Sequence, residues 1–484
     1  MSVNDYLIHK AEQLKPELHS RTVRVEGEDR AMSRGDAVLF DFGEHLTGTV
    51  SFDLSYEGHH PDAPVRLIVR FAENEREFSE DAEAYGGWIC KSWIQQEQVF
   101  ADVIPGELKL PRRYAFRYVR LEVADISSRF CLKADGAVCI ATTSADTEHA
   151  VRFSIQDEAL QKIDEVSVRT LRECMQDVFE DGPKRDRRLW LGDLRLQMLT
   201  NDVTFRNYDL AKRCLYLFAG TSFDDGRMAS CVFTSPVPEA DDTYMFDYAL
   251  LFTKALSDYY AQTHDGDALR DLWPCAKAQF EQAERYCGQD GVFRIPEEEG
   301  RCFIDWNLSL DKEVSALGVW LYCADAAKTL AEVLDDGEFR RAICRRAEER
   351  RVAGKRLFDV QTGLFVSGPK KQVSMASQIW AVLGGLTDDP EILERAKRRH
   401  ALKMVSPYMH HYYLEALLKL GKKKDAIDVI RSYWGGMAEK GADTFWELYD
   451  PEDPDGSPYG GTVVNSYCHA WSCTPAWFIR TIQM

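Results

Sequence analysis

The chain of 484 residues is 45 % hydrophobic and 29 % charged, which is enough apolar material for packed cores and excludes a disordered chain. Its 79 Asp and Glu residues outnumber its 60 Lys and Arg residues, and the net charge of −19 disfavours nucleic acid as a partner. No segment approaches the ~18 apolar residues that a membrane span needs, and the N-terminus lacks the apolar core of a secretion signal, so we expect a cytoplasmic protein without a membrane partner.

The first 150 residues show the pattern of β-strands. Apolar residues occupy every second position in several short runs, which is the period of a half-buried strand. Asp135-Gly136 lies at the centre of one more apolar run and is a pair typical of a β-hairpin turn. We therefore predict a jelly-roll-like β-sandwich over residues 1–150, whose polar N-terminal segment fits either an arm or a helix. The runs lie at 50–56, 65–71, 119–123 and 130–140.

After the strands, the apolar period changes to that of an α-helix. Ala249, Phe252 and Leu256, for example, follow one another at the spacing of a single helical face. Twelve helices in consecutive pairs predict an (α/α)6 barrel over residues 151–484. The helices are expected near 157–176, 192–203, 207–219, 242–263, 266–287, 311–333, 336–357, 372–385, 389–402, 408–420, 422–438 and 465–480.

The densest group of charged residues is the segment 181–193, between the first two predicted helices. It holds three aspartates, four basic residues and one Trp. Gly182 and Pro183 prevent a helix from continuing, so these side chains are expected on a loop at one end of the barrel. The alternative is a solvated loop in which Asp and Arg neutralise one another. Trp190 counts against that alternative, because an exposed indole needs a reason.

A second polar segment, 442–461, carries Glu447 directly after Phe445 and Trp446. Desolvation beside aromatic rings raises the pKa of a carboxyl group, which suits general acid or base catalysis. The alternative is a glutamate at the end of a helix that faces water.

Two shorter segments add candidate residues. Asp305 precedes Trp306 shortly before a predicted helix, and His469 lies early in the last predicted helix. A single His on such a helix is more often a core residue than a catalytic one, so His469 alone does not indicate chemistry.

No metal or cofactor site is expected. The 13 cysteines are irregularly spaced, include no Cys-x-x-Cys pair and are typical of reduced thiols. Asp450, Asp453 and Asp455 depart from the spacing of a calcium-binding loop. The sequence also lacks a serine-nucleophile elbow, a zinc-protease helix and a phosphate-binding loop, which disfavours the three corresponding enzyme classes.

Taken together, these segments resemble glycoside hydrolase family 78, the bacterial α-L-rhamnosidases. Members carry a loop of the form Asp-x-Pro-x-x-acid followed by Trp-x-Gly-Asp, a late Thr-x-Trp-Glu motif, an Asp-Trp pair and an Asn-x-x-x-His-like segment. Two upstream segments, 41–52 and 114–123, look like the β-sandwich that precedes the barrel in this family. The matching motifs here are Asp181–Asp193, Thr444–Glu447, Asp305–Trp306 and Asn465–His469.

The resemblance implies an N-terminal β-sandwich followed by an (α/α)6 barrel of six helical hairpins. It implies an inverting glycoside hydrolase that removes terminal α-L-rhamnosyl or related deoxyhexosyl residues from small glycosides or oligosaccharides, without a cofactor. Two carboxyl groups suffice for such a reaction, and the resemblance implies Asp186 as the general acid and Glu447 as the general base. Because cations lower the pKa of a neighbouring carboxyl group, we expect Arg185 and Arg187 to point away from Asp186. The residues expected to hold the sugar are Asp181, Arg185, Trp190, Asp193, Asp305, Trp306, Trp446 and His469.

The sequence departs from the family pattern at two positions. Many members have a second acidic residue where Arg187 stands, and a cysteine where Gly182 stands. The chain also stops after the last predicted helix, as in a minimal version without the C-terminal sandwich of many relatives. Its sugar can therefore differ from rhamnose.

Two alternatives stay open. Lys184, Arg187 and Arg188 would suit a substrate carboxylate or phosphate, which fits a uronide hydrolase or a glycoside phosphorylase on the same barrel. A sugar-binding protein without catalytic activity would keep the same scaffold. The sequence does not decide whether copies of the chain form a homo-oligomer.

Overall fold

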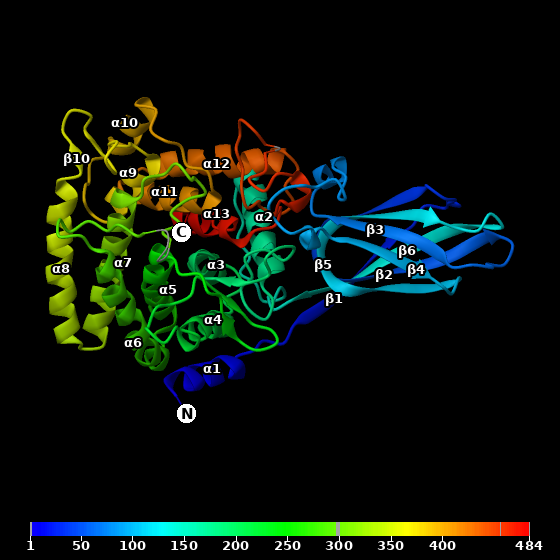
Figure 1. The fold of residues 1–484 in the computed structure, drawn as a ribbon, viewed down its shortest axis with the longest axis horizontal. Helices are drawn as coiled ribbons and strands as arrows, with labels where there is room; N and C mark the ends of the chain where they lie inside the picture. The colour runs from blue at the N-terminus through cyan, green and yellow to red at the C-terminus, as the bar shows by residue number, and fades with distance from the viewer. Residues whose placement is uncertain (1, 297–300, 455, 484) are drawn as a thin grey trace.

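The computed structural model describes residues 2–296, 301–454 and 456–483. It has two parts, a β-sheet at one end of the molecule and a larger group of helices at the other (Figure 1). Asp455, one of the aspartates compared above with a calcium-binding loop, lies outside the described residues. None of the helices in the described ranges combines the length and the apolar character needed to cross a membrane.

Within the described part of the chain, six antiparallel strands join one sheet in the order β1-β6-β2-β5-β3-β4. The runs that alternate in the sequence all fall inside strands of this sheet, so those predictions are confirmed. The strands are β1 (His19–Glu26), β2 (Ala37–Gly58), β3 (Val65–Ala72), β4 (Gln96–Ala101), β5 (Gly106–Asp125) and β6 (Phe130–Thr143).

The hydrogen bonds place all these strands in one continuous sheet, where a sandwich of two sheets was expected. The two longest strands, β2 and β5, have 22 and 20 residues. Their register shifts after Asp41 and again after Thr49, and such bulges bend and twist a strand. Alternate residues of the bent strands, such as Phe52 and Leu121, form the hydrophobic core of the sheet.

Asp135-Gly136 does not form the expected hairpin turn. Both residues lie inside β6, where Gly136 pairs with Asp53 and Ala134 pairs with Leu54. Asp135 is therefore the extra residue of a β-bulge in a continuous strand. A glycine inside a strand is typical of such a bulge, and the sequence pair alone does not distinguish a bulge from a turn.

The described residues of the helical part form twelve helices near the twelve predicted positions. Short strands are added to them: β7 (Leu189–Trp190), β8 (Cys231–Phe233) and β9 (Glu239–Ala240) form a small sheet beside α3, and β10 (Phe358–Asp359) pairs with β11 (Leu364–Phe365). The helices are α2 (Glu158–Cys174), α3 (Leu191–Val203), α4 (Tyr208–Gly220), α5 (Phe246–Thr263), α6 (Gly266–Ala283), α7 (Glu313–Val333), α8 (Gly337–Lys355), α9 (Met375–Leu383), α10 (Ile392–Arg398), α11 (Pro407–Lys419), α12 (Lys423–Glu439) and α13 (Pro475–Gln483).

Apolar faces of these helices build one hydrophobic core. In α5, the side chains of Ala249, Phe252 and Leu256 are buried, as the helical period predicts. Alternate helices contact one another in the order α3, α5, α7, α9 and α11. The last helix, α13, contacts α3. The intervening helices each pack against a neighbour in the series.

The last helix begins at Pro475 and not near residue 465 as expected. Proline is accommodated in the first turn of a helix but breaks the interior, which explains the late start. The preceding residues form two short 3-10 turns, η4 (Thr462–Val464) and η5 (Ala470–Ser472). His469 therefore lies on a loop, directly before η5, and its predicted place on a helix is wrong.

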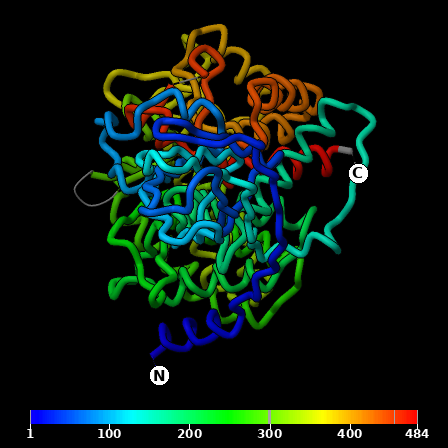
Figure 2. Tube along the Cα trace, turned by 90° about the vertical axis from the view of Figure 1, so that its right-hand side faces the viewer, coloured from blue at the N-terminus to red at the C-terminus, as the bar shows by residue number. Residues whose placement is uncertain are grey.

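The N-terminal segment forms a helix, α1 (Val3–Gln13), that lies against α4 of the helical part (Figure 1). An Arg213 guanidinium nitrogen donates a hydrogen bond of 2.6 Å to the backbone oxygen of Ala11. Ile8 approaches Gly220 so closely that a Cβ atom there would lie 2.9 Å from the Ile8 side chain. From α1 the chain runs upward to the sheet (Figure 2). The first residues of the chain thus pack with the helices and not with the sheet.

Candidate active site

A pocket of about 400 Å³ is lined by residues of the helical part and by a loop of the sheet part. All of the predicted site residues except Asp305 and Trp446 are in its lining. The fold therefore brings together segments that lie far apart in the sequence. The lining residues are Trp88, Ile89, Cys90, Trp93, Asp181, Arg185, Asp186, Trp190, Asp193, Thr243, Met245, Tyr248, Arg301, Phe303, Trp306, Glu447, Tyr459, His469 and Trp471.

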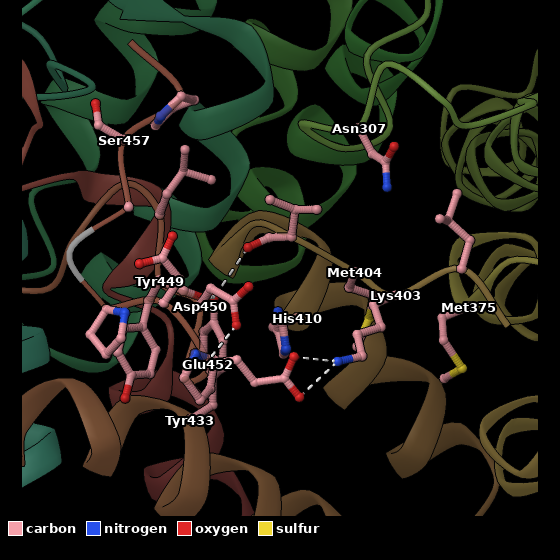
Figure 3. A pocket seen from close by; sticks show the side chains of 18 of the residues that line it. Asn307, Met375, Lys403, Met404, His410, Tyr433, Tyr449, Asp450, Glu452 and Ser457 are labelled. Atoms are coloured by element: carbon pink, nitrogen blue, oxygen red, sulfur yellow. Dashed lines mark hydrogen bonds and ion pairs between the residues drawn. The ribbon is translucent and has the colours of Figure 1, made fainter. Parts of the chain in front are cut away.

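A larger cleft of about 740 Å³ lies beside the acidic loop that follows Glu447 (Figure 3). None of the predicted site residues lines it. Its Lys403 side chain pairs with Glu452 at 2.9 Å, and both side chains are largely exposed, as in an ordinary surface ion pair. We therefore place the candidate site in the smaller pocket, where the carboxyl groups are buried.

The residues from Asp181 to Arg188 fold into a tight loop between α2 and α3. The Asp181 N–H donates to the Arg188 backbone oxygen at 3.0 Å, and the Arg188 N–H donates back to the Asp181 carboxylate at 3.0 Å. Gly182 permits this loop geometry, because a Cβ atom here would fall 2.6 Å from the backbone oxygen of Arg185 and the loop would have to shift. The loop projects Arg185 and Asp186 into the pocket, and Asp193 follows in the first turn of α3.

Asp181, Asp193 and His469 form a buried cluster in the pocket. The His469 Nδ1 atom lies 3.6 Å from the Asp193 Oδ1 atom, and the His469 Nε2 atom lies 3.9 Å from the Asp181 Oδ2 atom. Burial raises the pKa of both carboxyl groups, and neighbouring carboxylates raise each pKa further. Burial also lowers the pKa of His469. The cluster therefore favours protonated acids beside a neutral imidazole.

Glu447 enters the same pocket from a distant part of the chain. One of its carboxylate oxygens accepts a hydrogen bond from Arg185, and the other accepts one from the Tyr459 hydroxyl group. Burial raises the pKa of Glu447, while Arg185 and Tyr459 oppose this rise. An Arg185 Nη1 atom also lies 3.6 Å from the Asp186 Oδ1 atom. Arg185 thus lies between the two carboxylates, and the expectation that it points away from Asp186 is wrong, because the buried Glu447 needs a cation.

The other cations of the loop face away from the pocket. Arg187 donates from Nε to the backbone oxygen of Lys184 at 3.2 Å, and burial lowers its pKa to about 10. The Arg188 guanidinium stacks over the ring of Phe233 at 4.5 Å. Lys184, Arg187 and Arg188 are not in the pocket lining.

Asp305 lies next to the pocket and not in its lining. Its carboxylate accepts hydrogen bonds from the backbone N–H groups of Val405 at 2.8 Å and Ser406 at 3.0 Å. The Ser406 hydroxyl group adds a third bond of 2.6 Å. Asp305 therefore ties the start of α11 to the segment that carries Trp306. Trp306 itself lines the pocket.

Trp446 also lies outside the lining, although Glu447 beside it is inside. The Trp446 ring is almost fully buried and packs edge-on against Tyr449 and Tyr467. The Arg76 guanidinium of the sheet part covers it at 5.2 Å. Trp446 thus packs against the sheet part, while Glu447 faces the pocket.

Sequence reasoning missed Tyr248, Tyr459 and Trp471. Tyr459 hydrogen-bonds Glu447, and the Trp471 indole N–H donates to the Glu447 backbone oxygen at 2.9 Å. Tyr248 packs over Gly192, where a Cβ atom would fall 2.2 Å from the ring. The glycine of the Trp-x-Gly-Asp motif was therefore a signal that another group packs closely beside Asp193.

Two family models cover almost the whole chain. The model described as the glycosyl hydrolase family 78 alpha-rhamnosidase N-terminal domain matches residues 10–141. The model described as the bacterial alpha-L-rhamnosidase 6 hairpin glycosidase domain matches residues 148–482. The chain belongs to glycoside hydrolase family 78. It is accordingly a glycoside hydrolase of the α-L-rhamnosidase type.

Solved structures of the family are similar to this chain. A rhamnosidase from Klebsiella oxytoca with rhamnose bound is 43 % identical, covers 99 % of both chains and has a TM-score of 0.94. A family 78 rhamnosidase of Bacillus sp. GL1 is 21 % identical with a TM-score of 0.78, over 99 % of this chain and 48 % of the other. The α-L-rhamnosidase of Streptomyces avermitilis is 16 % identical with a TM-score of 0.70, over 97 % of this chain and 44 % of the other. The last two show the shared fold alone. No curated protein matches the chain.

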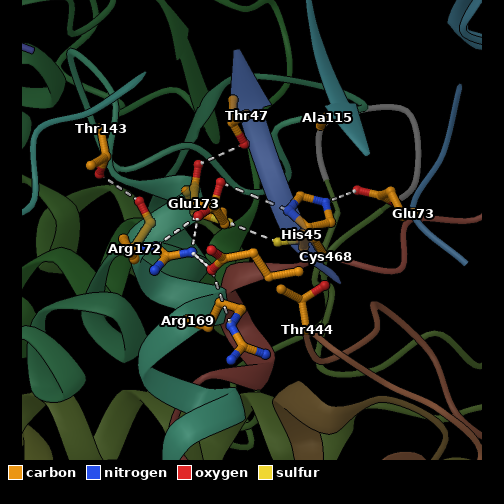
Figure 4. Close-up of polar contacts among 12 residues, drawn as sticks. His45, Thr47, Glu73, Ala115, Thr143, Arg169, Arg172, Glu173, Thr444 and Cys468 are labelled. Atoms are coloured by element: carbon orange, nitrogen blue, oxygen red, sulfur yellow. Dashed lines mark hydrogen bonds and ion pairs between the residues drawn. The ribbon is translucent and has the colours of Figure 1, made fainter. Parts of the chain in front are cut away.

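A buried group of charged side chains connects the sheet to the helical part of this family 78 protein (Figure 4). His45 of β2 lies between two glutamates, with Glu73 at 3.1 Å from Nε2 and Glu173 of α2 at 3.8 Å from Nδ1. Burial lowers the pKa of His45, but Cys468 and the two carboxylates outweigh burial and raise the pKa well above its usual value. These neighbours therefore favour the protonated form of His45 between the two parts.

Glu73 extends this network to the pocket. Its carboxylate accepts the backbone N–H of Tyr467 at 2.7 Å and lies 3.3 Å from the Lys184 ammonium. Lys184 also pairs with Glu77 at 2.8 Å. Because Lys184 precedes Arg185 and Tyr467 lies close to His469, the sheet part holds two of the segments that carry the site.

Proposed function

We propose that the chain hydrolyses the bond between a terminal α-L-rhamnosyl or related deoxyhexosyl residue and its leaving group, with inversion at the anomeric carbon. Two differently surrounded carboxyl groups in one pocket carry this proposal. Glu447 is held by Arg185 and Tyr459, and Asp193 is buried beside His469. An inverting glycosidase needs such a pair, an ionised base that activates water and a protonated acid for the leaving oxygen. A helical domain closed into an (α/α)6 barrel is part of the proposal, supported by the contact of α13 with α3.

Glu447 is the general base of the proposed reaction. A guanidinium group and a phenol hydroxyl group fix its two oxygens, and both favour the ionised form. A water molecule that gives its proton to Glu447 would attack the anomeric carbon from the face opposite to the leaving group. The acid and base carboxyl groups would then lie about 6.5–9.5 Å apart, with room for this water.

The surroundings of the loop carboxyl groups favour Asp193 over Asp186 as the general acid. The Asp186 side chain is 25 % exposed and lies 3.6 Å from the Arg185 guanidinium, an arrangement that suits an ion pair. The Asp193 side chain is 3 % exposed, and burial together with the charges of Glu447 and Asp186 raises its pKa. A general acid needs such a raised pKa. We therefore revise the sequence-based assignment and give Asp186 the role of orienting Arg185.

Unpaired polar groups and aromatic rings support a sugar in the pocket. Within the described chain, Asp193 Oδ1, His469 Nδ1 and Trp306 Nε1 are buried without a hydrogen-bond partner. Sugar hydroxyl groups would satisfy such atoms, since a buried polar group without a partner is costly. Trp190 and Trp306 line the same pocket and would contact the apolar face of the ring. The Klebsiella oxytoca relative is a rhamnosidase with rhamnose bound, which supports a rhamnosyl group as the sugar.

The phosphorylase and uronide hydrolase alternatives depended on Lys184, Arg187 and Arg188. None of these three cations is in the pocket lining. Hydrolysis with water as the acceptor therefore fits the pocket better than attack by phosphate.

The Glu447→Gln variant tests the base. We expect kcat to fall by a factor of about 10² to 10⁴ on every rhamnoside, because the proton acceptor is lost, while L-rhamnose still binds. Proton NMR on the wild-type reaction should show the product sugar first in the anomeric configuration opposite to that of the substrate. Product with the retained configuration, or near-normal turnover of the variant, would refute the inverting mechanism.

Asp193→Asn and Asp186→Asn form a matched pair that tests the acid. Loss of the acid should slow substrates with poor leaving groups, such as alkyl rhamnosides, far more than nitrophenyl rhamnoside, whose leaving group needs little protonation. We expect this dependence for Asp193→Asn and a uniform loss for Asp186→Asn. The reverse result would return the acid role to Asp186. Rhamnose binding without turnover of any glycoside by the wild type would favour a non-catalytic protein.

A further inference from the structure

A loop of the sheet part forms one wall of the pocket. Residues 85–94, called here the rim loop, lie between η1 (Glu75–Ser79) and β4 and reach over the helical part. Four of its side chains line the pocket beside the predicted site residues. They are Trp88, Ile89, Cys90 and Trp93.

The rim loop is anchored to the segment that carries Tyr459. The Tyr85 hydroxyl group donates to the Tyr459 backbone oxygen at 2.7 Å, and the Trp88 indole N–H donates to the Pro458 backbone oxygen at 2.9 Å. At Gly87 the two segments touch so closely that a Cβ atom would fall 1.9 Å from the Tyr459 backbone oxygen. Tyr85 and Tyr459 also belong to a small hydrophobic cluster with Val463. The position of Trp88 is thus fixed by the fold.

The pocket has a buried end and an exposed end. Asp193 and Glu447 are 2 % and 5 % exposed, whereas Trp88 is 68 % exposed. A terminal sugar whose anomeric carbon lies between the two carboxyl groups occupies the buried end, with its glycosidic oxygen at Asp193. The rest of its leaving group then extends toward the rim loop at the exposed end. The Trp88 ring contacts the Tyr459 ring, with 5.4 Å between the ring centroids and a tilt of 53°. The Trp88 indole N–H already donates to Pro458 and is not available to a ligand. The exposed remainder of the ring is apolar surface beside the path of the leaving group.

We propose that Trp88 is the platform on which the leaving group of the substrate stacks. An exposed indole at a pocket mouth offers a flat apolar face to a ring, either the C–H face of a second sugar or an aromatic alcohol. The preferred substrates are therefore rhamnosides whose leaving group begins with a ring, and not those of straight-chain alcohols. This inference rests on the proposed function only in placing the terminal sugar at the buried end.

The test compares leaving groups with and without a ring. The substrates are a rhamnosyl-glucose disaccharide, phenyl α-L-rhamnoside and α-L-rhamnosyl fluoride, whose leaving group is a single atom. For Trp88→Ala we expect kcat/KM to fall about tenfold on the two ring substrates, mainly through KM, and to stay unchanged on the fluoride. Trp88→Phe should retain most of the activity. Phe100→Ala, which removes an exposed aromatic ring of β4 outside the pocket lining, is the matched control and should change none of the three.

Each outcome decides the role of Trp88. A loss on only one of the ring substrates identifies which kind of ring the platform takes and supports the proposal. An equal loss on the fluoride would overturn it, because Trp88 would then act by positioning Tyr459 and Glu447. No loss on any substrate would overturn it as well.

Binding to the Glu447→Gln protein separates this inference from the proposed function. By calorimetry, adding Trp88→Ala to that variant should weaken binding of the disaccharide about tenfold and leave binding of free L-rhamnose unchanged. If L-rhamnose binds and the disaccharide ignores Trp88, the inference fails and the proposed function stands. If L-rhamnose does not bind at all, the proposed function fails and the inference with it.

Discussion

Replacing Lys184 with Met tests the charged network between the sheet and the pocket. The Lys184 side chain is 1 % exposed, and its ammonium group lies 2.8 Å from Glu77 and 3.3 Å from Glu73. Methionine fills a similar space without the charge. Removal of one partner from a buried ion pair costs about 3–5 kcal/mol, because the other partner stays buried without compensation. We therefore expect the free energy of unfolding to fall by about this amount at pH 8.

The loss should grow with pH because of Glu77. Burial raises the pKa of Glu77 from 4.5 to about 7, although Lys184 opposes this rise. A carboxyl group with a raised folded pKa contributes stability that is present below its unfolded pKa and is lost as the pH rises through the folded pKa. Without Lys184 the folded pKa of Glu77 is higher still. The variant should therefore continue to lose stability above pH 7, by up to about 1.4 kcal/mol per pH unit.

Urea unfolding followed by tryptophan fluorescence measures this effect at pH 6 and pH 9. Lys424→Met is the matched control, since Lys424 is 87 % exposed and pairs with Asp428 on the surface. It should cost less than about 1 kcal/mol at either pH. The double variant Lys184→Met/Glu77→Gln should recover part of the loss and show a weaker pH dependence, because Glu73 is then the one carboxylate left beside the missing ammonium group. A Lys184→Met loss as small as that of the control, or one equal at both pH values, would refute the reasoning.

Two further predictions concern metals and the connection between the two parts. Rhamnosidase activity should survive exhaustive EDTA treatment, because no group of three or more His, Cys, Asp or Glu side chains in the described chain is arranged to hold a metal ion. A complete loss of activity that added divalent metal restores would contradict this prediction. Residues 150–484 expressed alone should be less heat-stable and less active than the full chain, because Lys184 then loses Glu73 and Glu77 and the pocket loses its rim loop. A soluble fragment with full activity and an equal melting temperature would show that the sheet part is dispensable.

Periodicity predicted the elements of the fold well where one face of an element is buried. The helix expected at 242–263 is α5, because its apolar residues recur at the helical spacing and pack into the core. A short sequence pattern was ambiguous where two different local structures have the same pattern. Asp135-Gly136 fits both a turn and a bulge, and only the pairing of β6 with β2 distinguishes them. The late start of α13 was readable from Pro475, which the apolar pattern of the region obscured.

The motifs located the site but not the direction of every side chain in it. Trp446 and Glu447 are neighbours in one motif, yet Trp446 packs under Arg76 while Glu447 faces the pocket. Asp305 belongs to another motif and uses its carboxylate to hold the start of α11. These directions depend on partners from other parts of the chain. The rim loop was not predicted at all, because residues 85–94 have no apolar period and no catalytic motif.

The sheet part meets the pocket through two physically different connections. The charged network of Glu73 and Lys184 supports the loop that carries Arg185, and Arg185 holds Glu447. A change in this network should therefore act on the position of the base, which affects kcat on every substrate. Trp88 touches the pocket at its exposed end and should affect only what is bound there, through KM and only for leaving groups with a ring. Substitutions in the sheet part thus divide into two kinetic classes according to which connection they break. The class of a substitution follows from the position of the residue along the pocket and not from its distance to Glu447.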